Sequence, residues 1–209
     1  MRTPKNVHYI VGIDEAGRGP LAGWVAVGVA CVFVDNKNFK KFSRGVRDSK
    51  KLSEKQREEW FVKMTSEKKN GKFNFAVSFA SAKMIDTRGL SFAIYHALAS
   101  ALKKLNLPQE ETLVLLDGGL HAPKEYIHQK TIIHGDDIES IISLASICAK
   151  VTRDRKMRVL AKKYPEYGFE KHKGYGTKEH YRAIKKYGIL EEIHRKSFLV
   201  VHKVRTTKP

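Results

Sequence analysis

The chain reads GIDEAGRGPLAG from Gly12 to Gly23, and this segment separates the two apolar stretches that begin the fold. The stretches cover residues 7–13 and 24–34 and are rich in Val, Ile and small apolar residues, which is typical of neighbouring strands. The adjacent carboxylates Asp14 and Glu15 therefore follow the end of a predicted strand. Two neighbouring anions beside an apolar strand need compensation, so the segment predicts a cation site next to a glycine-rich turn.

The composition is that of a folded and strongly basic protein. At 209 residues with 42% hydrophobic content, the chain is long enough for one domain, or for one domain with an appendage. Its 40 Lys and Arg residues exceed its 22 Asp and Glu residues and give a formal net charge of +18. Such a charge attracts phosphate backbones, but a merely soluble, lysine-rich surface has the same composition. Charge alone leaves both interpretations open.

The cysteines and the longest apolar run bear on the compartment. Cys31 lies in a strand-like run and Cys148 in a helix-like run, and no CxxC pair is present, so we expect buried free thiols in a reducing compartment. The apolar run over 21–34 is too short to span a membrane and follows charged residues. We therefore expect a cytoplasmic protein with no membrane association and no targeting signal.

Further elements follow from periodicity and from helix-breaking residues. Ser53 and Gln56 form a capping box that opens a helix, which Asn70-Gly71 closes. The stretch 72–80 alternates apolar side chains on one face and is a predicted strand. A helix is predicted over 90–105, and its apolar face should cover the sheet.

The second half of the chain adds two strands and two helices. Predicted strands over 112–116 and 130–134 run into Asp117 and Asp136, and the second of them is an edge strand. A helix with one buried face follows and ends before Pro165, and another is expected over 178–187.

This order of elements predicts an α/β fold with a mixed central sheet flanked by helices. The later strands should run parallel to the first through crossover connections. After Pro165 the chain becomes rich in Tyr, His, Lys and Gly. We therefore expect a catalytic domain over residues 1–162 and a basic helical appendage over 163–209 that contributes to substrate binding.

Four carboxylates, those of Asp14, Glu15, Asp117 and Asp136, lie at or just beyond the ends of predicted strands. Open α/β sheets bind their ligands there, so the four side chains should converge if the strands are neighbours. Oxygen ligands without His or Cys favour Mg²⁺ or Mn²⁺, and two such ions support in-line hydrolysis of a phosphodiester. A single acid at a strand end is usually a turn former or a helix cap, so the convergence carries the prediction.

Seven motifs, in a shared order, resemble those of bacterial ribonuclease HII along nearly the whole chain. They are GIDEAGRGPLAG at 12–23, DSKKLS at 48–53, LLDG at 115–118, GD at 135–136, ASICAKVTRDRKM at 145–157, HKGYGT at 172–177 and IHRKSF at 193–198. Any one of them is suggestive, and their common order makes the resemblance specific.

The resemblance implies a ribonuclease H-like fold with a small C-terminal helical region, and endonucleolytic cleavage of RNA in RNA–DNA hybrids with Mg²⁺ or Mn²⁺. The family also incises duplex DNA 5′ to a single embedded ribonucleotide and leaves 3′-hydroxyl and 5′-phosphate ends. The implied partners are RNA–DNA hybrids and ribonucleotide-containing DNA, and we expect a monomer. By motif match, the four metal-binding and catalytic positions are Asp14, Glu15, Asp117 and Asp136.

The same motif match implies a substrate-binding set. Gly17, Arg18 and Gly19 match the segment whose backbone senses the ribose 2′-hydroxyl, the group by which a protein tells RNA from DNA. Tyr175 matches the tyrosine that reads the ribose at the junction, and Lys50 matches a phosphate-contacting lysine. Without the motifs, Tyr175 would be interpreted as a surface aromatic and Lys50 as a solvated charge.

Four further residues are candidates for the phosphate path: His172, Lys173, His180 and Arg195. The two histidines are equally compatible with a structural role.

The chain departs from the family pattern at two places. Trp24 stands where the family usually has proline, which is expected to change only the packing at the start of the second strand. After Asp136 the chain carries additional carboxylates at Asp137 and Glu139. Asp137 therefore competes with Asp136 as the fourth metal ligand.

Three other functions remain as alternatives. A resolvase-like or transposase-like DNA nuclease would share the acids and the basic surface, and it would cut an all-DNA duplex as readily as one with a ribonucleotide. A non-catalytic nucleic-acid-binding module would have no use for the acid cluster. Ribonuclease HIII carries an extra N-terminal binding domain, for which the position of the DEAGRG motif leaves no room.

Overall fold

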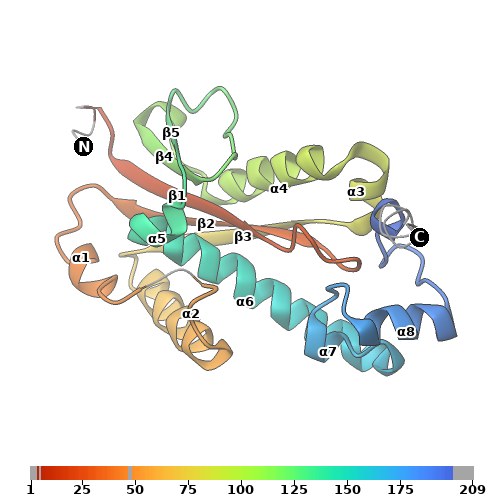
Figure 1. The fold of residues 1–209 in the computed structure, drawn as a ribbon. Helices are drawn as coiled ribbons and strands as arrows, with labels where there is room; N and C mark the ends of the chain where they lie inside the picture. Colours follow the sequence, from red (N-terminus) through yellow and green to blue (C-terminus); the bar gives the residue numbers. More distant parts are fainter. Residues whose placement is uncertain (1–3, 5, 47–48, 200–209) are drawn as a thin grey trace.

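The computed structural model describes residue 4 and residues 6–46 and 49–199 (Figure 1). Asp48, the first residue of the DSKKLS motif, and the last ten residues of the predicted appendage lie outside the described residues. In the part that is described, no helix is both long enough and apolar enough to cross a bilayer.

A five-stranded mixed sheet forms the centre of the fold, in the order β3-β2-β1-β4-β5. The first three strands pair antiparallel, whereas β4 and β5 run parallel to β1, as predicted. The strands are β1 Tyr9–Ala16, β2 Val25–Phe33, β3 Asn74–Ala80, β4 Thr112–Asp117 and β5 His128–Ile132.

Helices cover both faces of the sheet (Figure 1). One face packs against α4, which supplies small and branched residues such as Ala97 and Leu98, and the other packs against α2 and α6. The strands alternate accordingly, since Val11 and Ile13 of β1 face α4 while Ile10 packs on the other side. The α-helices are α1 Phe39–Phe42, α2 Glu54–Lys69, α3 Ala82–Arg88, α4 Leu90–Leu105, α5 Gly135–Ile138, α6 Ser140–Lys163, α7 Phe169–His172 and α8 Lys178–Tyr187, and short 3₁₀ turns cover Gln109–Glu111 and Pro165–Tyr167.

Two strand glycines allow α6 to lie unusually close to the sheet. A Cβ atom added at Gly12 would lie 2.4 Å from the carbonyl carbon of Ile141, and one added at Gly28 would lie 2.2 Å from the carbonyl oxygen of Ala145. A side chain at either position would push the helix outward. The close approach therefore fixes α6 against the strand that carries Asp14.

The predicted helices and strands are confirmed, with differences at the site residues. β1 continues to Ala16, so Asp14 and Glu15 lie within this strand and not after its end. β5 ends at Ile132 rather than at 134, because His134 takes a left-handed conformation with φ 55° and turns the chain away from the sheet edge. Asp136 consequently lies in the short helix α5 and not at the end of a strand. The following helix begins at Ser140.

The C-terminal elements pack on the last turns of α6. A small apolar cluster joins Met157 and Leu160 of α6 to Phe169 of α7 and Ala183 of α8. Trp24 lies half-buried at the edge of this cluster, with Nζ of Lys156 4.0 Å from its ring centroid. Cys31 and Cys148 are buried free thiols, also as predicted.

Candidate active site

Three of the predicted acids converge at one edge of the sheet. Each of Asp14, Asp117 and Asp136 offers a carboxylate oxygen, and the three oxygens lie within 4.8 Å of one another. Asp14 and Asp117 lie side by side because β1 and β4 are parallel neighbours, with Ile13 opposite Leu116. Asp136 is brought to them by α5, whose backbone N–H groups at residues 135 and 136 donate to Oδ1 of Asp117 at 2.7 and 3.4 Å.

Asp14 is the electrostatic centre of this cluster. It is 2% exposed, its Oδ1 accepts the Glu15 backbone N–H at 2.7 Å, and its buried Oδ2 has no hydrogen-bond partner in the described structure. Burial, and secondly the neighbouring Glu15 carboxylate, raise the pKa of Asp14 to about 8. An unpartnered buried carboxylate oxygen is costly unless a cation compensates it.

The donor set fits a divalent cation. It consists of carboxylate oxygens without His or Cys, which is the ligand chemistry that Mg²⁺ and Mn²⁺ prefer. The partnerless Oδ2 of Asp14 supplies a ligand atom that no protein group already occupies. Asp14, Asp117 and Asp136 are therefore the residues that would hold such an ion.

Glu15 does not join the three-acid group in this structure. Its Oε1 accepts from Nη1 of Arg18 at 3.0 Å, and its side chain is 11% exposed. The pair is local, since the two residues are three positions apart. The metal-binding role of Glu15 thus remains a prediction.

The structure distinguishes Asp136 from Asp137, the alternative candidate for the fourth metal ligand. Asp136 is buried and belongs to the cluster, whereas Asp137 is more exposed and forms an ion pair with Lys51. The adjacent lysine, Lys50, places Nζ 3.1 Å from Oδ2 of Asp136. Ser49 anchors this segment, because its hydroxyl lies 2.7 Å from that of Ser146 on α6.

The Gly17-Arg18-Gly19 turn lies beside Tyr175. A Cβ atom added at Gly19 would lie 3.9 Å from Cε1 of Tyr175, and the tyrosine is 43% exposed. Gly17 has φ 92°, and a Cβ there would lie 2.1 Å from Nε of Arg153, so only glycine fits. Two predicted substrate-binding elements from distant parts of the chain therefore share one surface.

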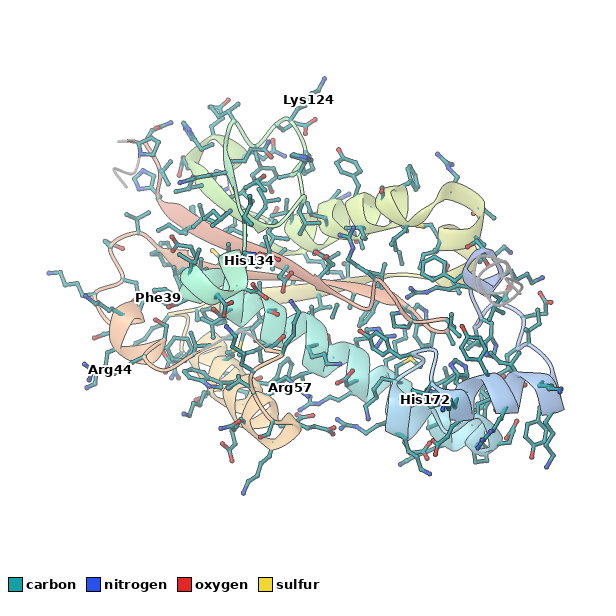
Figure 2. The ribbon with its side chains drawn as sticks, viewed as in Figure 1. Phe39, Arg44, Arg57, Lys124, His134 and His172 are labelled. Atoms are coloured by element: carbon teal, nitrogen blue, oxygen red, sulfur yellow. The ribbon has the colours of Figure 1, made fainter. Side chains whose placement is uncertain are left out.

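The expectation that His172, His180 and Arg195 line a phosphate path is wrong for this structure. All three are buried, with His180 and Arg195 at 0% exposure. The two histidines stack with ring centroids 4.5 Å apart, and Arg195 binds backbone carbonyls. Lys173 is partly buried, with Nζ 3.9 Å from Oε2 of Glu54. Figure 2 shows His172 near the C-terminal end of α6 and His134 near the opposite end of that helix.

Comparison with known proteins decides the family. The family model for ribonuclease HII matches residues 11–201. The chain belongs to the ribonuclease HII family. Curated ribonuclease HII proteins from Caldicellulosiruptor bescii and Clostridioides difficile are 44% and 46% identical over 91% and 93% of this chain, and the matches cover 86% and 71% of those proteins.

Solved structures agree with the fold. The ribonuclease H2 of Pyrococcus horikoshii OT3 superposes with a TM-score of 0.69 at 29% identity, over 95% of this chain and 97% of its own. Bst ribonuclease HIII gives a TM-score of 0.68 at 19% identity, over 95% of this chain and 70% of its own, which shows a shared ribonuclease H-like fold alone. As a ribonuclease HII, the chain is a metal-dependent endoribonuclease that cleaves RNA in RNA–DNA hybrids.

Sequence reasoning missed the residues that hold this ribonuclease HII site in place. Ser146 and Arg153 on α6 contact Ser49 and the carbonyl oxygen of Trp24, and Arg195 contacts the glycine-rich turn. No local pattern identifies such contacts, since they join segments more than ninety positions apart. The available signal was the position of Ser146 and Arg153 inside the ASICAKVTRDRKM motif.

Proposed function

We propose that this member of the ribonuclease HII family, which cleaves RNA in RNA–DNA hybrids, also incises duplex DNA on the 5′ side of a single embedded ribonucleotide. The products would carry 3′-hydroxyl and 5′-phosphate ends. Two divalent ions, Mg²⁺ or Mn²⁺, would be held by Asp14, Glu15, Asp117 and Asp136. When bound, such ions supply an activated water for the attack and stabilise charge on the leaving oxygen.

One observation carries this proposal: the buried Oδ2 of Asp14 has no partner and lies in a group of three converging carboxylates. In the absence of a cation, a carboxylate buried in this way lowers the stability of the folded protein. A bound cation would compensate this cost, which supports a metal-binding role for the cluster. Asp117 would contribute twice, because Oδ1 also binds the α5 backbone that presents Asp136. Glu15 would join the set by leaving Arg18.

Substrate selection would come from the surface beside the acids. We propose that the backbone of Gly17, Arg18 and Gly19 contacts the ribose 2′-hydroxyl, and that the half-exposed ring of Tyr175 stacks on the sugar or base at the junction. Lys50 would contact a phosphate near Asp136. The acids would then lie directly beside the group that distinguishes RNA from DNA.

The basic C-terminal segment fits a supporting role in binding. Lys178, Arg182, Lys185 and Lys186 belong to α8, outside the small apolar cluster that this helix forms with α6 and α7. We propose that residues 163–209 act as an appendage to a catalytic domain over 1–162 and add sequence-independent attraction for phosphates. We further propose that the protein acts as a monomer in the cytoplasm.

A cleavage assay on matched duplexes tests the proposal. The purified protein is incubated with EDTA, Mg²⁺ or Mn²⁺ and with duplexes of one sequence that contain zero, one or four consecutive ribonucleotides. In the presence of metal, we expect incision 5′ to the ribonucleotide in the duplex that contains one, and cleavage within the ribonucleotide run in the duplex that contains four. The all-DNA duplex should not be cleaved. Equal cleavage of the all-DNA duplex would favour the resolvase-like alternative, and binding without cleavage in any metal would favour the non-catalytic one.

A further inference from the structure

A fully buried arginine binds the glycine-rich turn from the inside. Arg195 is 0% exposed, and its guanidinium donates to three backbone carbonyls of the 17–23 segment. Nη2 donates to Gly17 at 2.8 Å, Nη1 to Arg18 at 2.8 Å and Nε to Gly23 at 3.0 Å. Every donor-bearing nitrogen of the guanidinium is thus committed to this one turn.

The burial of Arg195 has no ion-pair explanation. In the described ranges, the Arg195 guanidinium forms no ion pair with a carboxylate; Asp86 acts on it only at longer range, and the larger charge effect comes from Arg153, which has the same sign. A buried cation without a carboxylate is unfavourable unless oriented dipoles replace its hydration. The three carbonyls provide those dipoles, so the guanidinium and the conformation of the turn depend on each other.

The contact fixes the direction of two peptide groups. In a planar trans peptide, the C=O of one residue and the N–H of the next point in opposite directions. Because the carbonyls of Gly17 and Arg18 point to Arg195, the N–H groups of Arg18 and Gly19 point away from it. Arg18 and Gly19 are exposed, and neither N–H donates to a protein group in the described part of the chain.

We propose that Arg195 is a positioning residue for ribose recognition: it holds these two N–H groups toward the substrate, where they donate to the oxygen of the ribose 2′-hydroxyl. The inference rests on the proposed recognition of the ribose by the 17–19 backbone and adds the group that orients it. The ring of Tyr175 lies beside Gly19 and completes the same surface. Ribose selection would thereby depend on a residue that never touches the substrate.

Backbone hydrogen bonds hold the segment around Arg195 against the glycine-rich turn. The Arg195 backbone N–H donates to the carbonyl of Leu21 at 2.7 Å, and the Gly23 N–H donates to the carbonyl of Ile193 at 2.8 Å. On its other side, Asp86 of α3 accepts the backbone N–H groups of Lys196 and Ser197 at 2.9 and 3.0 Å. The C-terminal segment is therefore fastened both to the turn and to α3.

Binding measurements on Arg195→Lys test the proposal without relying on catalysis. The lysine keeps the positive charge but loses the planar fork that reaches three carbonyls. Dissociation constants are measured in EDTA for a labelled duplex with one ribonucleotide and for the all-DNA duplex of the same sequence. In the wild type we expect the ribonucleotide duplex to bind about tenfold more tightly, as two hydrogen bonds would give. In Arg195→Lys this ratio should fall toward one, with all-DNA binding unchanged.

A second variant tests whether lowered stability alone changes the ratio of the two dissociation constants. Met64→Ala opens a cavity under α2, away from the turn, and should lower the melting temperature while keeping the binding ratio of the wild type. A ratio retained in Arg195→Lys would overturn the inference and leave the proposed function standing. A wild-type protein with no preference for the ribonucleotide duplex would instead overturn the proposed ribose recognition.

If Arg195→Lys does not fold, the amide resonances of the wild type provide the test. With ¹⁵N-labelled protein, the ribonucleotide duplex should shift the Arg18 and Gly19 amides more than the all-DNA duplex does. Identical shifts with the two duplexes would overturn the inference.

Discussion

The ammonium group of Lys50 lies 3.1 Å from Oδ2 of Asp136 and covers this buried carboxylate from the solvent side. The Lys50 side chain is 75% exposed, whereas that of Asp136 is 5% exposed. The ammonium group thus neutralises part of the acid cluster. Lys50 has to share Asp136 with any metal ion, and its exposed side chain lies at the surface where we propose that a phosphate binds.

Replacement of Lys50 by Gln should have two separable effects. The metal concentration needed for half-maximal cleavage should fall, because a competing ammonium is removed. Duplex binding should weaken equally for all sequences. In a plot of the logarithm of the association constant against the logarithm of the salt concentration, the magnitude of the slope should decrease by about one. Lys124→Gln, in the loop between β4 and β5 (Figure 2), is the control and should leave the metal requirement unchanged. A salt slope equal to that of the wild type would rule out the phosphate contact.

Gly28→Ala should destabilise the fold by displacing α6. The new Cβ would lie 2.2 Å from the carbonyl oxygen of Ala145 and 2.9 Å from the nitrogen of Ala149, both of which are helix backbone. Overpacking of this kind costs roughly 1–3 kcal/mol or more, or about 2–4 °C in Tm for each kcal/mol in a chain of this size. Thermal denaturation measures the loss. Gly119→Ala is the control, since no atom of the described chain lies within 4 Å of its added Cβ; equal Tm values for the two variants would contradict the packing argument.

A chain of buried histidines supports the Tyr175 loop and has defined tautomers. The Leu190 N–H donates to Nδ1 of His194 at 2.8 Å, so the proton of His194 lies on Nε2, which faces Nε2 of His180 at 3.1 Å. His180 in turn donates from Nδ1 to the carbonyl of Tyr175 at 2.9 Å. Both rings are neutral in this arrangement, because a further proton on either would place two donors face to face.

Stability should therefore fall in mild acid. Burial is the main cause that lowers the pKa of His180 from 6.5 to about 4. Above pH 6.5 the folded and unfolded states are both neutral at this residue. Between pH 6.5 and 4 only the unfolded state binds the proton, so the free energy of unfolding decreases by up to about 1.4 kcal/mol per pH unit. Urea denaturation from pH 7.5 to 4.5 should show this slope, and His180→Gln should reduce it.

The exposed residue His121 provides the comparison for that experiment. His121→Gln should retain the full pH dependence of the wild type. A pH dependence unaltered in His180→Gln would show that the buried histidines do not set acid stability.

Two variants of Tyr175 should distinguish the contribution of its ring to the incision rate from that of its hydroxyl. Tyr175→Ala removes the half-exposed ring beside Gly19 and should slow incision at a single ribonucleotide by about tenfold or more, since stacking on one base contributes roughly 1–3 kcal/mol. Tyr175→Phe keeps the ring and should lose less. Single-turnover rates measure both, with the exposed aromatic Phe33→Ala as control. Wild-type rates in both Tyr175 variants would exclude the assigned role.

The sequence was sufficient where local pattern determines structure. The apolar composition of β1 and β4 predicted two buried strands, and their parallel pairing followed from the order of elements, which brings Asp14 and Asp117 together. Asp136 was harder to place, because β5 is a polar edge strand and a left-handed residue, His134, redirects the chain after it.

Long-range contacts account for what sequence pattern alone missed. Arg195 reaches the Gly17 carbonyl across 178 positions, and Ser49 reaches Ser146 across 97. No periodicity or turn chemistry encodes such pairs. The interpretation of His180 as a phosphate-path residue failed for the same reason, since its burial depends on Phe169 and His194, which pack on it from two other segments.

Single-turnover cleavage by Asp14→Asn tests the central claim most directly. The amide is nearly isosteric and cannot ionise, so the metal-free protein should melt no lower than the wild type and should still bind a duplex with one ribonucleotide. Cleavage in Mg²⁺ should fall by about a thousandfold or more, because the stabilisation that a metal site gives the transition state amounts to several kcal/mol. Cleavage at the wild-type rate in Mg²⁺ would contradict the assignment of this acid cluster as the catalytic metal site.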